Sequence, residues 1–548
     1  GLNVTTRVVL TPTRAGVRVL VFNLSPRMRL ISAAINGAPA EFFQRDAMRE
    51  NLIRGTDAVF LLLPGAPMEP GKRYEVEFRN EGHIVQDTGN KVYFVGARDN
   101  WYPKLPIQFS QYDVTFRYPS DLNLVVAGEL VEEAAGEGWR TTRHRIATPV
   151  SFLGFNLGVY QHVAQTRGPY SVEVFANKQL EPRIQELPGA SGVLPPRRVY
   201  DPITRRSIVV PGSVMIPMPV LPPDPAERLQ ELASEIGAAF EFMASRFGPP
   251  PIRNLTVSPI PGNFGQGFPG LVYLPTLSYI RLQQRPGLPA NPNRQAVPEI
   301  LLAHEVAHQW WGNVVAPDSN QDTWLMEALA NYSALLFLEK RKGAKALESI
   351  LADYSRNLRS TVAEGRTIDS TGPIAWGPRL ISSQAPAAWR VITYEKGSWI
   401  IHMLRRRLGD ERFLAMLAEV VKRYRQSTLT TEQFRAVAVK FLPPGSPDPK
   451  LETFFENWVY STGIPTLQLS HSVRGKAAAY TLTGSLTQSG VDAEFSAWVP
   501  IEVHFKTGKP LVHWVRTDSD PAGFTVALKQ APARVLLDPS SSVLSVRK

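Results

Sequence analysis

The residues best suited to chemistry lie in the stretch His304-Glu305-Val306-Ala307-His308, where two histidines flank a glutamate. Pro298 and Glu299 are typical of a first helical turn, so we expect one helix to run through this stretch. Positions four apart share one face of a helix, so both imidazoles can bind a single metal ion. Glu305 lies beside that face, where its carboxylate can take a proton from a water molecule without binding the metal.

A catalytic zinc ion needs a third protein ligand and one open position for water. Glu327, within the helical stretch Trp324–Ala330, is the best candidate for that ligand. The 18 residues between His308 and Glu327 let the first helix end near Gly312 and a second helix return antiparallel. Two imidazoles and one carboxylate suit zinc, and we therefore expect one zinc ion.

The alternative is that these histidines are ordinary packed or surface residues. A histidine on a helix is more often such a residue than a ligand, and the HExxH pattern also occurs in proteins without a metal. The chain, however, has only 9 histidines among 548 residues. Few chance pairs at this spacing around a glutamate are expected, so metal binding is the favoured interpretation.

Composition indicates a globular protein of several domains, with 43% hydrophobic and 20% charged residues. The net charge of +11 has two interpretations: attraction to an acidic partner such as nucleic acid, or a solvated basic surface. The second is favoured, because the longest basic run is Arg405–Arg407 and no basic patch with interleaved aromatic residues is present. We therefore expect no nucleic-acid partner.

The chain contains no cysteine, which excludes disulfides, thiolate zinc sites and cysteine nucleophiles. No apolar run approaches the roughly 18 residues that a membrane span requires, so we expect no spanning segment. The chain begins at Gly1 without a methionine or a signal sequence, which indicates a processed or trimmed N-terminus. A bacterial envelope or secreted location is one expectation, while the sequence fixes neither compartment nor oligomeric state.

Hydrophobic patterning predicts a β domain over residues 1–167. Stretches such as Val17–Phe22 and Tyr74–Phe78 are rich in β-branched and aromatic residues, and turn signals separate them. Residues 180–223 are dense in proline and predict an extended connection. A helix is expected to begin directly after this connection, with Asp224 as its N-cap.

Helical periodicity dominates the chain from residue 298 to residue 463, and the whole segment 168–463 is expected to form one catalytic domain. Alternating β patterns return in residues 464–548, such as Trp498–Phe505. That pattern predicts a small C-terminal β-sandwich.

The chain resembles the M1 family of gluzincin metallopeptidases. Three motifs in the family's order carry the resemblance: the segment 304–312 (HEVAHQWWG), Trp324-Leu325-Met326-Glu327, and Tyr394-Glu395-Lys396-Gly397. Segments 95–103 (VGARDNWYP) and 455–465 (FENWVYSTGIP) add weaker likenesses. The resemblance implies a multidomain α+β fold with an N-terminal β saddle domain, a thermolysin-like zinc catalytic domain and a C-terminal β-sandwich.

The resemblance also implies an aminopeptidase-like activity on peptide substrates. In that mechanism Glu305 moves the proton of the attacking water, and Tyr394 donates a hydrogen bond to the oxyanion that forms at the scissile carbonyl. The sequence departs from the family at Met326, where asparagine is usual beside the glutamate ligand.

A second departure concerns substrate binding. Family aminopeptidases carry a Gly-x-Met-Glu-Asn loop whose glutamate holds the free α-amine of the substrate. The corresponding residues are Gly265, Gln266, Gly267 and Phe268, where Phe268, or Gly267 in a shifted alignment, takes the place of the glutamate. No acidic residue lies between Glu241 and Glu299. We expect this loop to form an edge strand beside the substrate backbone, without the carboxylate that an ammonium group requires.

Three hypotheses follow from that departure. The chain is an aminopeptidase whose amine partner comes from elsewhere, such as Glu395 or the N-terminal domain; a peptidase that needs no free N-terminus; or a non-catalytic binding scaffold. The scaffold is least favoured, because the zinc-site residues, Glu305 and Tyr394 are all present.

Overall fold

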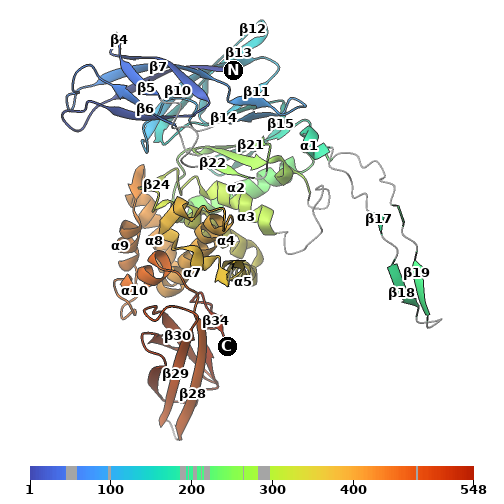
Figure 1. The fold of residues 1–548 in the computed structure, drawn as a ribbon, viewed down its shortest axis with the longest axis vertical. Coiled ribbons are helices and arrows are strands. Elements are labelled where there is room, and N and C mark those ends of the chain that lie inside the picture. Colours follow the sequence, from blue (N-terminus) through green and yellow to red (C-terminus); the bar gives the residue numbers. More distant parts are fainter. Residues whose placement is uncertain are drawn as a thin grey trace. The chain divides into compact units, whose positions relative to one another are not determined.

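The protein has a mixed α and β architecture with several separate sheets (Figure 1), which confirms the predicted fold class. The computed structural model describes residues 1–44, 58–96, 100–185, 193–194, 197–201, 206–210, 213–214, 223–262, 264–281, 296–363, 365–476 and 479–548. These residues form two compact units. Residues 1–237 and 252–298 make up the first unit, and residues 238–251 and 299–548 the second. The predicted domain boundaries near 167 and 463 stay predictions.

Antiparallel sheets open the first unit. One has the order β1 (Leu2–Leu10), β7 (Tyr74–Gly82), β3 (Met28–Ile35) and β4 (Ala38–Pro39), and another β2 (Leu20–Leu24), β6 (Ala58–Leu63) and β5 (Glu41–Gln44). Alternate residues of β7 are buried, as its sequence predicts. The rings of Phe22, Phe60 and Phe78 pack with centroids 4.8–5.6 Å apart, which joins β2, β6 and β7 through one core. The predicted strand at Val17 starts later, at Leu20.

Further strands extend this β region. They are β8 (Val85–Asp87) paired with β9 (Tyr93–Val95), β11 (Asn123–Val126) paired with β14 (Phe155–Gly158), and the sheet β10 (Ser110–Pro119), β13 (Trp139–Val150), β12 (Glu129–Gly136). Trp101 packs edge-on against Phe155 with ring centroids 5.2 Å apart. Its indole also donates to the Leu153 carbonyl. Residues 97–99 of the weaker family likeness lie outside the described residues.

A five-stranded sheet completes the first unit. Its order is β15 (Tyr160–Arg167), β16 (Tyr170–Asn177), β21 (Asn254–Ile260), β23 (Leu271–Pro275) and β22 (Gln266–Phe268). Strands β16, β21 and β23 run parallel, and β22 lies at one edge, antiparallel to β23. Gly270 has φ +70° in the turn between β22 and β23, where a Cβ would lie 2.8 Å from the Ile252 side chain. Only glycine fits this tight turn without strain.

Much of the proline-rich connection, including residues 186–192 and 215–222, lies outside the described residues. Its described parts are α1 (Pro182–Gln185) and two short antiparallel pairs, β17 (Val193–Leu194) with β20 (Ser213–Val214) and β18 (Arg197–Asp201) with β19 (Arg206–Val210). The helix expected from Asp224 begins later, as α2 (Leu229–Phe247). Asp224 instead accepts the Ala226 amide at 2.8 Å within a turn, so its side chain caps that turn and not the helix.

Helices dominate the second unit. They are α3 (Ala296–Ala307, which begins in the first unit), α4 (Thr323–Lys342), α5 (Ala344–Leu358), α6 (Ala388–Arg390), α7 (Gly397–Leu408), α8 (Asp410–Arg423), α9 (Thr431–Val439) and α10 (Glu452–Phe455). Short parallel strands β24 (Val315–Pro317) and β27 (Ser427–Leu429) pair with each other, and β25 (Thr361–Ala363) pairs with β26 (Arg366–Thr367). Almost all of α4 from Trp324 to Leu338 is buried, so it is the central helix that the others pack around.

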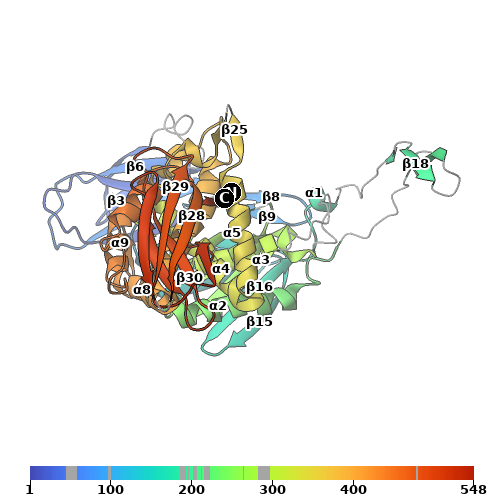
Figure 2. The same cartoon turned by 90° about the horizontal axis from the view of Figure 1, so that it is seen from below.

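The second unit ends in two sheets, as expected for a small β-sandwich. One is β32 (Ala522–Leu528), β29 (Ala479–Ser489), β28 (Thr466–Lys476) and β34 (Val546–Arg547), and the other is β31 (Leu511–Arg516), β30 (Trp498–His504) and β33 (Arg534–Leu537). Figure 2 shows β28 and β29 side by side along their length. None of the helices in the described ranges is long and apolar enough to cross a membrane.

One buried histidine makes the stability of the second unit depend on pH. His402 of α7 has a pKa lowered to about 3, first by burial and then by the charges of Arg405 and Arg406, while Asp410 acts in the opposite direction. Its Nδ1 lies 2.9 Å from the Tyr332 hydroxyl, which donates to the neutral ring. Because the unfolded histidine titrates near pH 6.5, the unfolded state binds the proton first as the pH falls.

We therefore expect the free energy of unfolding to fall below about pH 6.5, with His402 contributing up to about 1.4 kcal/mol per pH unit until its folded pKa is reached. A His402→Gln variant should flatten this part of the profile. Urea unfolding of both proteins between pH 7.5 and 4.5 measures the difference. Equal slopes in the two proteins would contradict the assignment.

Candidate metal centre

Two imidazoles and one carboxylate converge within the second unit. His304 lies in the last turn of α3, His308 directly follows that helix, and Glu327 lies in the second turn of α4. The two histidine Nε2 atoms are 3.0 Å apart. The Glu327 Oε2 lies 3.4 Å from the Nε2 of His304 and 3.6 Å from that of His308. The structure thus brings all three predicted ligands together.

The spacing of these atoms fits a tetrahedral metal. Bonds of about 2.0–2.1 Å to nitrogen and oxygen in tetrahedral geometry place two ligand atoms roughly 3.3 Å apart. Glu327 Oε2 is buried and has no hydrogen-bond partner within the described part of the chain. A cation would satisfy this oxygen, and the donor set of two nitrogens and one oxygen suits zinc. The residues present therefore fit the ion that the sequence predicts, and their assignment as ligands stays a prediction.

Backbone geometry at the end of α3 orients His308. Its amide donates to the His304 carbonyl at 3.2 Å, so the helical turn between the two histidines is intact. Its Nδ1 lies 2.8 Å from the Trp311 carbonyl, which accepts the Nδ1 proton. That bond directs Nε2 toward His304 and Glu327, so the ring would present the Nε2 lone pair to a metal once its Nε2 proton is lost.

Trp311 also fixes the register of α3 against α4. Its buried indole donates to the Ser333 hydroxyl at 3.0 Å, and Ser333 donates in turn to the Leu329 carbonyl within α4. On its other side Trp311 packs against Phe247 with ring centroids 5.3 Å apart. The two tryptophans after the HExxH pattern are therefore anchors, because Trp310 likewise donates to the Gly248 carbonyl.

Close helix packing holds Glu327 from the other side. A Cβ at Gly397, the first residue of α7, would lie 2.7 Å from the Cβ of Ala328. The glycine of the Tyr-x-Lys-Gly motif thus lets α7 approach α4 directly beside the carboxylate ligand. At the start of α4 the Trp324 indole donates to the Thr431 hydroxyl at 3.2 Å.

Glu305, the predicted general base, is 4% exposed. Its negative charge contributes to raising the pKa values of both His308 and Tyr394, so its carboxylate lies near both groups. It adjoins His304 in α3 but projects separately from the two imidazoles, because neighbouring helical residues point about 100° apart. Glu305 is therefore a second buried acidic group near the candidate ligand Glu327.

Burial and nearby charges shift the pKa values of the three candidate ligands in different directions. Burial lowers the pKa of His304, against the effect of Glu327. Burial also opposes the charged form of His308, but the Glu327 carboxylate outweighs it and raises the pKa of His308 to about 9. Burial opposes ionisation of Glu327, yet both histidines bring its pKa well below its usual range. The carboxylate is therefore ionised at neutral pH, as a metal ligand must be.

Tyr394 lies beside this cluster. It belongs to a π-helical segment, η7 (Val391–Lys396), that leads directly into α7. Its ring centroid lies 5.4 Å from that of His304 and 5.9 Å from that of Trp389. Burial, followed by the charge of Glu327, raises the pKa of Tyr394 well above its usual value. The hydroxyl stays protonated at neutral pH and is able to donate a hydrogen bond.

The structure does not present Phe268 to a substrate. Phe268 is 0% exposed in the core of the first unit. Its ring packs edge-on against Phe152 and Tyr273, with centroids 5.1 and 4.9 Å away. Gly265 precedes edge strand β22, which contains Gln266 and Gly267. The predicted edge strand is therefore present, and the substrate-binding role of these four residues stays a prediction.

Glu395, one predicted alternative for holding a substrate amine, is already engaged. Its Oε2 accepts from the Asn357 amide at 2.8 Å, and its Oε1 lies 3.5 Å from an Arg390 nitrogen. Burial raises the pKa of Glu395. These contacts tie η7 to α5, so the structure gives Glu395 a role in packing.

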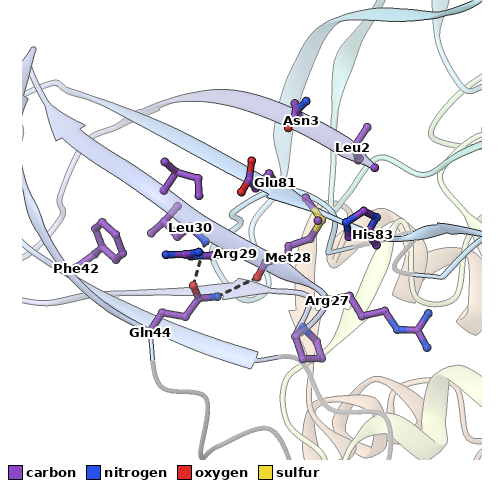
Figure 3. Close-up of a pocket in the computed structure, with 14 residues that line it drawn as sticks. Leu2, Asn3, Arg27, Met28, Arg29, Leu30, Phe42, Gln44, Glu81 and His83 are labelled. Carbon is purple, nitrogen blue, oxygen red and sulfur yellow. Dashed lines mark hydrogen bonds between the residues drawn. The ribbon is translucent and has the colours of Figure 1, made fainter.

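A cavity of about 840 Å³ lies in the first unit, away from every residue predicted for the site. Figure 3 shows it between β1, β3, β5 and β7, where Gln44 bonds to the backbone of β3. The Gln44 amide accepts from the Leu30 amide at 3.0 Å and donates to the Met28 carbonyl at 3.1 Å. This side chain satisfies part of the exposed edge of β3, which indicates an edge-protecting role.

Sequence reasoning missed several residues that support the site. Asn331 donates to the Ser398 hydroxyl at 2.9 Å and to the Tyr394 carbonyl at 3.4 Å, and so links α4 to η7. It lies four residues after Glu327, on the same face of α4. That spacing was a usable signal, whereas nothing local predicts the partners of Trp311 or Lys396.

Comparison with known proteins finds similar sequences and structures. Residues 274–458 match the family described as the peptidase family M1 domain. Aminopeptidase M1-B from Oryza sativa subsp. japonica is 31% identical over 204 residues, which cover 36% of this chain and 22% of that protein. Endoplasmic reticulum aminopeptidase 2 from Homo sapiens is 32% identical over 124 residues, covering 23% and 12%. The matched region thus spans less than a quarter of either relative.

Two solved structures share the fold. Aminopeptidase A from Legionella pneumophila, solved in complex with aspartic acid, has a TM-score of 0.66 at 17% identity and covers 100% of this chain and 57% of its own. An M1 zinc metallopeptidase from Deinococcus radiodurans, solved as a mutant, has a TM-score of 0.56 at 16% identity. The match covers 84% of this chain and 90% of that structure's chain. At these identities the likeness concerns the fold alone.

Replacing Glu327 tests the metal centre. We expect Glu327→Gln to weaken zinc binding by more than about 100-fold, since changes to residues that only support a ligand already cost about 10–100-fold. Glu339→Gln, the same substitution three turns further along α4, should leave zinc affinity unchanged. Competition titration with a chelating dye measures both. Equal zinc affinity in wild type and Glu327→Gln would remove Glu327 from the ligand set.

Replacing Phe268 distinguishes packing from substrate contact. Because its ring is fully buried, Phe268→Ala should lower the free energy of unfolding by about 3–5 kcal/mol. Chemical denaturation measures this loss. A loss below about 1 kcal/mol would show that the ring does not lie in the core.

Proposed function

We propose that this chain, whose residues 274–458 form a peptidase family M1 domain, is a zinc-dependent peptidase that hydrolyses peptide bonds. One observation carries the proposal: two imidazole nitrogens and a carboxylate oxygen lie within 3.0–3.6 Å of one another, and Glu305 and Tyr394 lie close to them. Bound there, one zinc ion would polarise the scissile carbonyl and lower the pKa of a water molecule. His304, His308 and Glu327 would hold that ion.

Glu305 is suited to proton transfer. Its carboxylate lies near His308 without belonging to the cluster of three ligand atoms. In the proposed reaction it takes the proton from the attacking water and later delivers it to the leaving amine. As a zinc ligand Glu327 would stay ionised through both steps, because metal binding requires the deprotonated carboxylate.

Tyr394 is suited to stabilise the negative charge that develops on the carbonyl oxygen. Its hydroxyl remains protonated, since burial and the charge of Glu327 raise its pKa. One such donor is typically worth about 3–4 kcal/mol in the transition state. The anchoring of η7 through Asn331 supplies the fixed position that this role requires.

The substrate is proposed to be a peptide, and the first candidate is aminopeptidase-like cleavage. The relatives compared above are named aminopeptidases. A second candidate, cleavage without a free N-terminus, is favoured by one observation. The loop expected to replace the family's amine-binding glutamate offers Phe268, or Gly267 in a shifted alignment, and Phe268 is fully buried. Glu395 is held by Asn357 and so offers no obvious replacement. An ammonium group without a compensating charge would bind poorly in a dry cleft.

The general-base assignment predicts a separation of metal binding from turnover. Glu305→Gln should lower kcat by about 10²–10⁴-fold while zinc remains bound, because the amide cannot accept a proton. Activity assays with zinc quantification on the same samples measure both quantities. Turnover at the wild-type rate would refute the role of Glu305.

Substrate blocking distinguishes the two candidates. We expect the zinc-loaded protein to cleave a peptide and its N-acetylated form with kcat/KM values within about tenfold, if no carboxylate binds the amine. Matched fluorogenic peptides that differ only in the acetyl group provide the measurement. A preference for the free amine of more than about 100-fold would establish aminopeptidase specificity. If the zinc-loaded protein cleaves neither peptide, and none of a broad set of further peptides, the non-catalytic scaffold hypothesis gains support.

A further inference from the structure

A fully buried ion pair lies beside the proposed oxyanion donor. Lys396 Nζ is 2.7 Å from Asp369 Oδ1, and the two side chains are 0% and 2% exposed. Lys396 is the last residue of η7, two residues after Tyr394. Asp369 begins a short 3₁₀ turn, η5 (Asp369–Thr371), that is separate in sequence from the metal centre.

The same pair also binds the segment that leads into the C-terminal sheets. Lys396 Nζ donates to the Ser461 carbonyl at 3.3 Å. Asp369 Oδ2 accepts the Gly463 amide at 2.7 Å. Two charged side chains thus connect three pieces of backbone: η7, η5 and residues 461–463.

We propose that Asp369 and Lys396 are positioning residues that fix Tyr394 for the proposed peptidase reaction. A π-helical segment has looser hydrogen bonding than an α-helix, and η7 therefore needs side-chain contacts to hold one conformation. Asn331 fixes the Tyr394 carbonyl, Glu395 binds Asn357, and the ion pair fixes the end of η7. The inference rests on the proposed function, because it assigns Tyr394 its role in that reaction.

Burial makes this pair a strong constraint. A charged ammonium or carboxylate is costly to bury unless its partner remains in place, so any displacement of η7 from η5 exposes an unpaired charge to an apolar interior. The pair therefore restricts η7 to one position more sharply than apolar packing does. Its contacts with Ser461 and Gly463 extend the same restriction to the link with the C-terminal sheets.

The decisive experiment is a double-mutant cycle between Asp369→Asn and Tyr394→Phe. Asparagine keeps the size and one acceptor for the Gly463 amide but removes the charge that Lys396 requires. We expect Asp369→Asn to lower kcat by about tenfold or more, up to the 10²–10³-fold typical of losing one oxyanion donor, with KM within about threefold and zinc content unchanged. In the Tyr394→Phe background the same substitution should lower kcat by less than about twofold.

Glu339→Gln serves as the matched control. Glu339 pairs with the buried Arg405 at 2.7 Å within the same unit, twelve residues after Glu327 in α4. This variant should lose stability without losing kcat. Amide hydrogen exchange of residues 391–396 gives a readout independent of activity: exchange should rise in Asp369→Asn and stay at the wild-type rate in Glu339→Gln.

Two results would overturn the inference. One is an equal loss of kcat on Asp369→Asn in both backgrounds, which would mean that the pair acts independently of Tyr394. The other is unchanged kcat and unchanged hydrogen exchange in the single variant. A wild-type protein that cleaves no peptide would instead refute the proposed function, while the exchange measurement would still test the coupling of the pair to η7.

Discussion

The site depends on one contact between helices, in which the end of α3 faces the second turn of α4. That contact places two imidazole nitrogens and a carboxylate oxygen within 3.0–3.6 Å of one another. Such an arrangement is unfavourable for the polypeptide alone, because Glu327 Oε2 is buried without a hydrogen-bond partner among the described residues and the two imidazole Nε2 atoms lie only 3.0 Å apart. A bound cation would satisfy all three atoms. Contacts from the surrounding elements hold the two helices in this position.

That support comes from side chains that do no chemistry. Trp311 ties the end of α3 to Ser333 of α4, and Gly397 lets α7 pack against Ala328. Asn331 then joins α4 to the segment that carries Tyr394. Because α4 contacts each of these elements, a shift of this one helix would move a ligand, the proposed oxyanion donor and the anchor of α3 together.

Much of this arrangement follows from local sequence. The residues HEVAH indicate a helix with two ligands on one face, and the helical stretch predicted at Trp324–Ala330 lies within the observed α4, Thr323–Lys342. The C-terminal strands were also predicted from their alternation. Longer-range features could not be predicted. No periodicity indicates that Lys396 is buried against Asp369, 27 residues earlier, or that the Trp311 carbonyl orients His308. The N-cap prediction at Asp224 was wrong, because the same side chain caps a turn equally well.

The fold and the activity therefore depend on different parts of the sequence. The mixed α and β architecture depends on repeated patterns and tolerates change at single positions. The proposed chemistry depends on a few atoms, whereas Phe268, which was expected to contact substrate, packs in the core of the first unit.

X-ray absorption at the zinc edge of the purified, zinc-loaded protein tests the central claim most directly. The account predicts a first shell of nitrogen and oxygen at about 2.0–2.1 Å, with the multiple-scattering signature of two imidazoles and no sulfur. A shell of oxygen alone, or one containing a single imidazole, would contradict the convergence of His304, His308 and Glu327 on one ion.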